Sequence, residues 1–167
     1  LFVHRLEAQF ILPTGDYSRD AEINPGSGIF SFDPYWAATV FFSPQWTLSW
    51  RAHYLWNDEN DRPSRLFGPH ATVQPGQAFH LNFATEYELW PKGLRLGFNG
   101  YFLRQITPAK VNGAELHDYR EQVIGLGPGA MWSFSPENHL FANLYWETGA
   151  HNRPEGMNFV LRYVHKF

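Results

Sequence analysis

The feature that most constrains the fold of this chain is a strict two-residue alternation of side chains at its C-terminal end. Side chains of an extended strand point alternately to opposite faces, so this alternation predicts a strand with one apolar and one polar face. A soluble sheet can end this way, but a strand of this kind also closes a barrel with an apolar lipid side and a polar lumen. The apolar face carries Phe159, Leu161, Tyr163, His165 and Phe167, and the other face carries Asn158, Val160, Arg162, Val164 and Lys166.

The same alternation recurs along the whole chain. Each repeat has about the ten residues that a tilted membrane strand requires. We therefore predict an all-β fold, a transmembrane antiparallel up-and-down β-barrel with about eight strands in this chain. The expected strands cover residues 1–12, 29–42, 46–57, 79–89, 94–105, 124–134, 140–147 and 156–167.

Tight turns alternate strictly with longer polar loops between these strands, as in barrels with short periplasmic turns and long external loops. The turns are 43–45, 91–93 and 135–138, and the long loops are 13–28, 58–77 and 106–120. Every tight turn falls on the side where the chain ends, which predicts that this side is periplasmic. Large rings crowd the turn ends, where an interfacial aromatic girdle would lie: Trp46, Trp90, Trp132 and Phe134, with Trp56 and Trp146 at the opposite rim.

Composition supports outward-facing rings. Aromatic residues make up 18% of the chain, yet its mean hydropathy is −0.39. A soluble barrel or sandwich would also alternate, but one small closed core could not hold so many bulky rings. The net charge of −3 argues against a nucleic-acid partner, and we expect none. The chain has no Cys and no run of about twenty apolar residues, and we take it to be mature or truncated.

Candidate chemistry is sparse. His53 and His80 fall on the polar face, but no third donor stands at a ligand spacing, so we predict no metal, no cofactor and no enzymatic activity. A membrane-barrel hydrolase using Ser49 with either histidine is the minor enzymatic alternative. Residues 58–61 could offer oxygen ligands to Ca²⁺, although solvated loop charge explains them better. The glycine pattern at 125–129 is not a dinucleotide loop, because a strand and not a helix continues from it.

Short motifs in a consistent order also resemble a known family. They are 12–17 (LPTGDY), 24–27 (NPGS), 57–60 (NDEN), 74–81 (QPGQAFHL), 97–107 (GFNGYFLRQIT), 125–129 (GLGPG) and 152–156 (NRPEG). Through them the chain resembles the outer-membrane channels named for the MetA pathway of phenol degradation, which are associated with uptake of hydrophobic compounds. Two departures stand out: family members carry more sequence before Leu1, and Pro108-Ala109 replaces a usual acidic pair.

The resemblance implies a complete barrel of about twelve strands. The number of strands in this chain supports the same conclusion, because a barrel of only eight strands is filled by its own side chains and leaves no channel. We therefore expect residues 1–167 to form a single outer-membrane β-barrel domain that lacks N-terminal strands. The implied function is passive uptake of small hydrophobic, aromatic molecules in the bacterial outer membrane, by a monomer whose partners are membrane lipid and the solute. The alternative from another class is a non-transporting structural or adhesive barrel.

Two sets of residues are predicted to serve transport. Pro34 and Pro128 cannot donate to a ladder, and glycines surround Pro128, so either close packing or a gap for lateral exit is expected there. The lateral-exit candidates are Pro34, Gly97, Gly125, Gly127, Pro128 and Gly129. The expected pore-lining residues are Arg5, Glu7, Asp33, Arg51, His53, His80, Glu86, Glu88, Arg95, Tyr101, Tyr145, Glu147 and Arg162.

Overall fold

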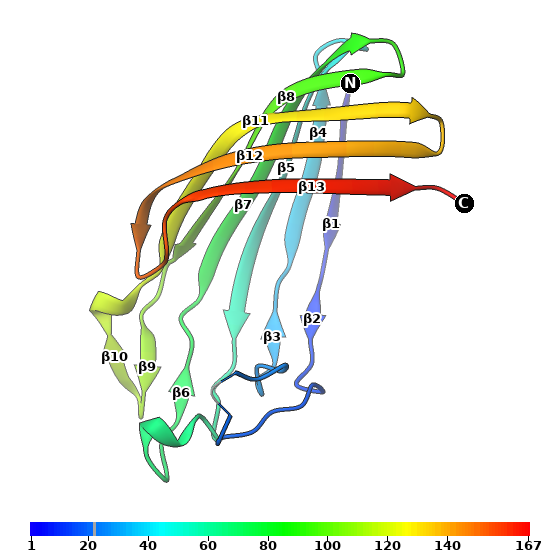
Figure 1. Ribbon diagram of the computed structural model, residues 1–167. Helices are drawn as coiled ribbons and strands as arrows, with labels where there is room; N and C mark the ends of the chain where they lie inside the picture. Colours follow the sequence, from blue (N-terminus) through cyan, green and yellow to red (C-terminus); the bar gives the residue numbers. More distant parts are fainter. Residues whose placement is uncertain (22) are drawn as a thin grey trace.

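The computed structural model describes residues 1–21 and 23–167, and one long, curved antiparallel sheet makes up most of it (Figure 1). Strands adjacent in the sheet follow one another along the chain, so the topology is up-and-down, as expected. β1 and β13 form the two edges. The sheet order is β1 (Phe2–Glu7), β4 (Tyr35–Phe41), β5 (Trp46–Asn57), β7 (Ala78–Trp90), β8 (Leu94–Gln105), β11 (Gln122–Ser135), β12 (Asn138–His151) and β13 (Met157–His165).

The strand register confirms the two faces predicted from the alternation. Residues paired across an antiparallel ladder point to the same side of the sheet. Trp50 pairs with Ala38 and Phe83, which are all on the expected apolar face. Arg51 pairs with Ala37 and Asn82, on the opposite side. Because a slip of one residue would exchange the faces, this agreement fixes the orientation of every strand in the sheet.

The apolar side chains lie outward instead of forming a core. Trp132, Trp146, Phe159 and Leu161 are each more than half exposed. The buried residues include polar ones, Asp33 and five others, whereas the buried apolar residues of the described chain are few and mostly small. This is the reverse of a water-soluble domain, and it suits a sheet whose outer solvent is lipid. The predicted turn-end rings are exposed as a girdle requires: Trp46, Trp90, Trp132 and Phe134.

Two predicted strands are each divided. The first becomes β1 and β2 (Phe10–Ile11), and the second becomes β3 (Ser31–Phe32) and β4. The divisions lie side by side, since the Asp33 amide donates to the Gln9 carbonyl at 2.9 Å. Pro34 has no amide to give, which accounts for the interruption of the ladder beside it.

The second and third long loops contain regular structure that the alternation did not predict. β6 (Val73–Gln74), β9 (Ala109–Val111) and β10 (Ala114–Leu116) form a small second sheet, seen at the lower left of Figure 1. Two 3₁₀ turns, η1 (Arg65–Phe67) and η2 (His117–Tyr119), lie in the same loops. Strands of two or three residues are too short to show a period, so they leave no alternation to detect in the sequence. Among the described residues, no helix has the length and apolar character needed to cross a membrane.

Candidate functional site

The side of the sheet that carries Arg51 and its cross-strand neighbours, called here the polar face, is the candidate site. A hollow of about 660 Å³ lies against it. Its lining comes from strands between β1 and β13 and combines charge with aromatic rings: Arg5, Arg51, Tyr101, Phe141, Tyr145 and Arg162. The predicted pore-lining residues thus share one face, and this face is concave where they gather.

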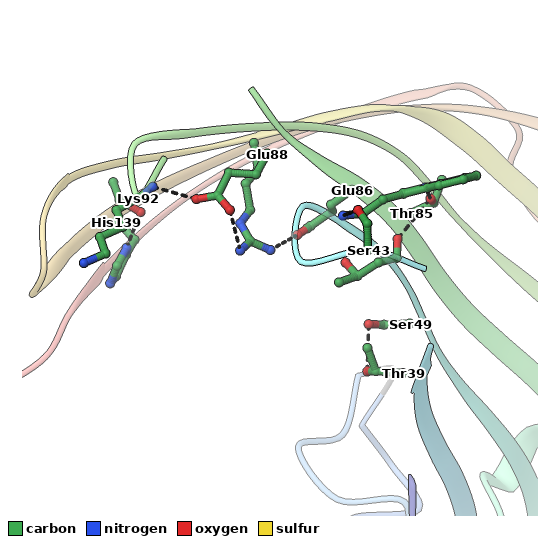
Figure 2. Close-up of polar contacts among 12 residues, drawn as sticks. Thr39, Ser43, Ser49, Thr85, Glu86, Glu88, Lys92 and His139 are labelled. Atoms are coloured by element: carbon green, nitrogen blue, oxygen red, sulfur yellow. Dashed lines mark hydrogen bonds and ion pairs between the residues drawn. The ribbon is translucent and has the colours of Figure 1, made fainter. Parts of the chain in front are cut away.

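The end of the polar face nearest the tight turns is held by an ion-pair network (Figure 2). A guanidinium nitrogen of Arg95 lies 3.6 Å from a Glu88 carboxylate oxygen, and another lies 3.9 Å from Glu86. Glu88 also accepts a hydrogen bond of 2.6 Å from the amide of Lys92, which adopts positive φ in the turn. One guanidinium group is thus shared by two carboxylates at this end of the face.

Glycines in β11 let long side chains from its two neighbours meet above it. Tyr101 on β8 donates its hydroxyl hydrogen bond to Glu147 on β12, and its ring covers Gly125 between them. Asn99 and Asn143 are hydrogen-bonded to each other over Gly129 in the same way. A Cβ on either glycine would collide with these side chains. The glycines of β11 therefore leave room for hydrogen-bonded side-chain pairs that connect β8 to β12 across the polar face.

The bridge from Tyr101 to Glu147 offers a direct test. Replacing Tyr101 with Phe keeps the ring over Gly125 but leaves the Glu147 carboxylate without its donor. A hydrogen bond to a charged group contributes roughly 1.5–3 kcal/mol, so the free energy of unfolding should fall by about that amount. Equilibrium unfolding of the detergent-folded protein measures it. Tyr163→Phe is the matched control on the opposite face, since that exposed hydroxyl bonds only to the Asn138 amide oxygen.

Of the two alternatives expected at Pro128, close packing or a gap, the gap would need a bulge, and the register shows none there. Pairing of β11 with β12 lapses at Gly127 and Pro128, yet the register is the same before and after them, and β8 pairs with both. Shifts occur instead near the strand ends, between Gln122 and Ile124 and between Ser133 and Ser135. A Cβ on Gly127 would overlap the Leu144 carbonyl oxygen. Close packing of neighbouring backbones therefore explains this glycine, and the glycines at 125 and 129 are covered by side chains and not by another segment.

The end of the polar face nearest the long loops holds a compact cluster of titratable groups. His53 and His80 are direct cross-strand partners on β5 and β7, and their rings stack at 4.1 Å. Asp33, from the junction of β3 and β4, lies 3.2 Å from Nδ1 of His53 through Oδ2 and 3.4 Å from Nε2 of His80 through Oδ1. Tyr35 stacks on the other side of His53, at 4.6 Å. The expectation that the two histidines have no third donor is therefore wrong.

The remaining arginines of the polar face have different environments. Arg5 pairs with Glu7 on the same strand. Arg51 lies 5.9 Å from the centre of the Tyr35 ring, and Arg162 lies 4.5 Å from that of Phe141. Both guanidinium groups thus sit over aromatic faces, an arrangement that favours binding of planar groups beside them. Phe141 and the asparagine bridge were not predicted as site residues, although the register of β8, β11 and β12 would have brought them together.

The two minor alternatives, a hydrolase site at Ser49 and a Ca²⁺ site at residues 58–61, have other local contacts. Ser49 shares a hydrogen bond of 2.9 Å with Thr39, and not with either histidine (Figure 2). In the 58–61 loop, Asp58 accepts from the amide of Glu59, and Asn60 accepts from the amide of Arg62. Within residues 1–21 and 23–167, the groups that converge as metal ligands are those of Asp33, His53 and His80.

Comparison with known proteins agrees with this architecture. The crystal structure of the COG4313 outer membrane channel from Pseudomonas putida F1 superposes with a TM-score of 0.82 at 20% sequence identity. The match covers 99% of this chain and 60% of that one, so this chain spans less than two thirds of the channel's length. No curated protein sequence matches the chain. The model of the family described as "Putative MetA-pathway of phenol degradation" matches residues 1–163. The chain belongs to that family, and it has the fold of an outer-membrane channel.

Proposed function

We propose that this chain forms most of the wall of a channel in the bacterial outer membrane, and that the channel takes up small hydrophobic, chiefly aromatic, molecules passively. The observation that carries the proposal is the hollow on the polar face, where Tyr101, Phe141 and Tyr145 stand among arginines. Rings offer stacking surfaces to an aromatic solute, and the guanidinium groups offer cation–π contacts. The family's link to phenol degradation and the channel-like fold support the same function.

The proposed channel needs further strands to close. β1 and β13 are the edges of an open sheet, and the solved channel that this chain resembles is longer. We propose a single barrel domain of about twelve strands, monomeric, with lipid against its apolar face. The polar groups across the face serve solvation and positioning and not catalysis.

Uptake into liposomes tests the proposal directly. Vesicles that contain the purified protein should accumulate phenol-sized aromatic solutes faster than protein-free vesicles, without an energy source. Replacing Phe141 and Tyr145 together by Ala should slow aromatic uptake several-fold but leave the uptake of a small sugar unchanged. Equal rates with and without protein would favour the alternative of a structural or adhesive barrel.

The orientation of the barrel makes a separate prediction. The tight turns and the chain's C-terminal end should face the periplasm, and the long loops should face outside. An epitope inserted at Gly113, in the exposed turn between β9 and β10, should be labelled by antibody on intact cells. The same epitope at Lys92 should be labelled only after the outer membrane is broken. The reverse pattern would overturn the orientation.

Exit of solute through the wall is a finer part of the proposal. The site would be the lapse in pairing at Gly127 and Pro128, which supports a weak point in an otherwise continuous wall. Pro128→Val restores an amide without adding to the crowded polar side, because Pro128 lies on the apolar face beside Phe98. It should slow uptake of hydrophobic solutes and leave small-ion conductance nearly unchanged. Unchanged hydrophobic uptake in the folded variant would exclude an exit at this point.

A further inference from the structure

We propose that Asp33, His53 and His80 form a binding site for one divalent transition-metal ion at the loop end of the polar face. One ligand nitrogen or oxygen from each residue lies within 4.8 Å of those of the other two. The proposal is independent of the transport function, because the site can bind an ion whether or not solute passes.

The distances suit a metal ion. Ligand atoms bound to one tetrahedral Zn²⁺ at ~2.0–2.1 Å lie ~3.3 Å from one another. The nitrogen–oxygen separations here are 3.2 Å from Nδ1 of His53 to Oδ2 of Asp33 and 3.4 Å from Nε2 of His80 to Oδ1, so the two carboxylate oxygens each face one imidazole. Because the two imidazoles are nearly parallel, at 17°, one ring must turn about its Cβ–Cγ bond for both lone pairs to meet at one ion. That torsion is broad in histidine, so such a turn is accessible to the ring.

Burial supplies the second argument. Asp33 is 7% exposed and His53 is 9% exposed. The Asp33 Oδ1 atom is buried and accepts no hydrogen bond from the described residues. A buried carboxylate with an unsatisfied oxygen is costly unless a cation is near. The carboxylate thus faces both imidazoles, and its Oδ1 atom lies 3.4 Å from Nε2 of His80 without a hydrogen bond to it.

Charge favours a metal over protons at this place. A proton on each imidazole would set two positive charges 4.1 Å apart, in rings stacked face to face. A divalent ion instead takes lone pairs from two neutral imidazoles and balances the carboxylate with a single centre. Two imidazoles and one carboxylate suit Cu²⁺, Ni²⁺, Fe²⁺ and Zn²⁺, with Cu²⁺ bound most tightly in the general order. Three protein ligands leave a position for water or for an oxygen of a passing solute.

The position of the cluster gives the ion a mechanical role. The histidines come from β5 and β7, and Asp33 stands beside Pro34 at the β3–β4 junction, just beyond the end of the β1–β4 ladder. A bound ion would tie the β3–β4 junction to β5 and β7 at this interruption. Metal should therefore raise the thermal unfolding temperature of the folded protein, and a chelator should lower it again.

Metal titration of the tag-free protein in detergent tests the site. Calorimetry with Zn²⁺ and with Cu²⁺ should give one ion per chain. Asp33→Asn, His53→Gln and His80→Gln should each weaken binding by more than the roughly 10–100-fold typical of lost outer-shell partners. His139→Gln is the control, because that histidine bonds to Ser133 at the far end of the sheet and should bind metal normally.

A spectroscopic measurement keeps the proposal falsifiable if a variant does not fold. The electron paramagnetic resonance spectrum of the Cu²⁺-loaded wild-type protein should show coupling to two imidazole nitrogens. A different nitrogen count would overturn the proposal. So would equal affinity in His53→Gln and the control, or the absence of binding with unfolding that depends on pH alone, which would mark the cluster as a proton-binding site.

Discussion

Arginine in place of Leu161 is expected to destabilise the protein by about 2–4 kcal/mol, the cost of a cation on the lipid side near the bilayer midplane. Leu161 lies near the middle of β13, is 60% exposed and pairs with Ala142 on the apolar face. Leu144→Arg, near the middle of β12, should behave alike. Leu48→Arg and Leu96→Arg should cost less, because those residues lie near the tight turns, and the penalty falls toward the interface.

The control for this series lies on the same strand. Asn158→Arg places the same side chain on the polar face, opposite Tyr145, and should change the free energy of unfolding little. Denaturant unfolding in lipid vesicles gives both values. Equal penalties at 158 and 161 would mean that both faces meet the same solvent, and the membrane interpretation would be contradicted.

Valine in place of Gly127 is expected to destabilise the protein by about 3 kcal/mol, the upper part of the usual cost of overpacking. The added Cβ would overlap the Leu144 carbonyl oxygen, and backbone cannot move aside as a flexible side chain can. Gly97→Val should act similarly against the Thr85 carbonyl. A loss of stability would be informative, because replacing glycine by valine ordinarily stabilises a strand.

Gly156→Val provides the comparison. No heavy atom lies within 4 Å of a Cβ at Gly156, so the substitution should be almost neutral. Thermal unfolding in detergent compares the two variants. If Gly127→Val were as stable as wild type, the backbones of β11 and β12 would not be in the close contact described, and the wall at Pro128 would be looser than the structure shows.

The faces and order of the strands were predictable from the sequence because a period of two carries over to every long strand. The Trp46–Asn57 strand, for example, has the predicted bounds. The small sheet of β6, β9 and β10 was not predictable, because its pairing depends on contacts between two separate loops and not on local pattern.

The sequence was sufficient to predict which residues lie on the polar face. It was not sufficient to predict which of them contact one another. Asp33 and the two histidines are 20 or more residues apart along the chain. The register of β5 with β7 pairs the histidines, and the pairing of β4 with β5 brings Asp33 beside them. The need for glycine at position 125 was also not predictable, because the ring that covers it belongs to Tyr101 on the neighbouring strand. Pro128 suggested a bulge, but its missing amide is accommodated within an unchanged register.

Modification of single cysteines during conductance recording tests the central claim that the polar face lines a water-filled channel. The chain has no native Cys, so a thiol can be placed at one position without background. Arg51→Cys should react with a charged methanethiosulfonate reagent, and the single-channel conductance in a planar bilayer should change in a step. Ala52→Cys, on the adjacent apolar-face position, should neither react nor change the conductance. The absence of channels, or an equal response at the two positions, would contradict the account.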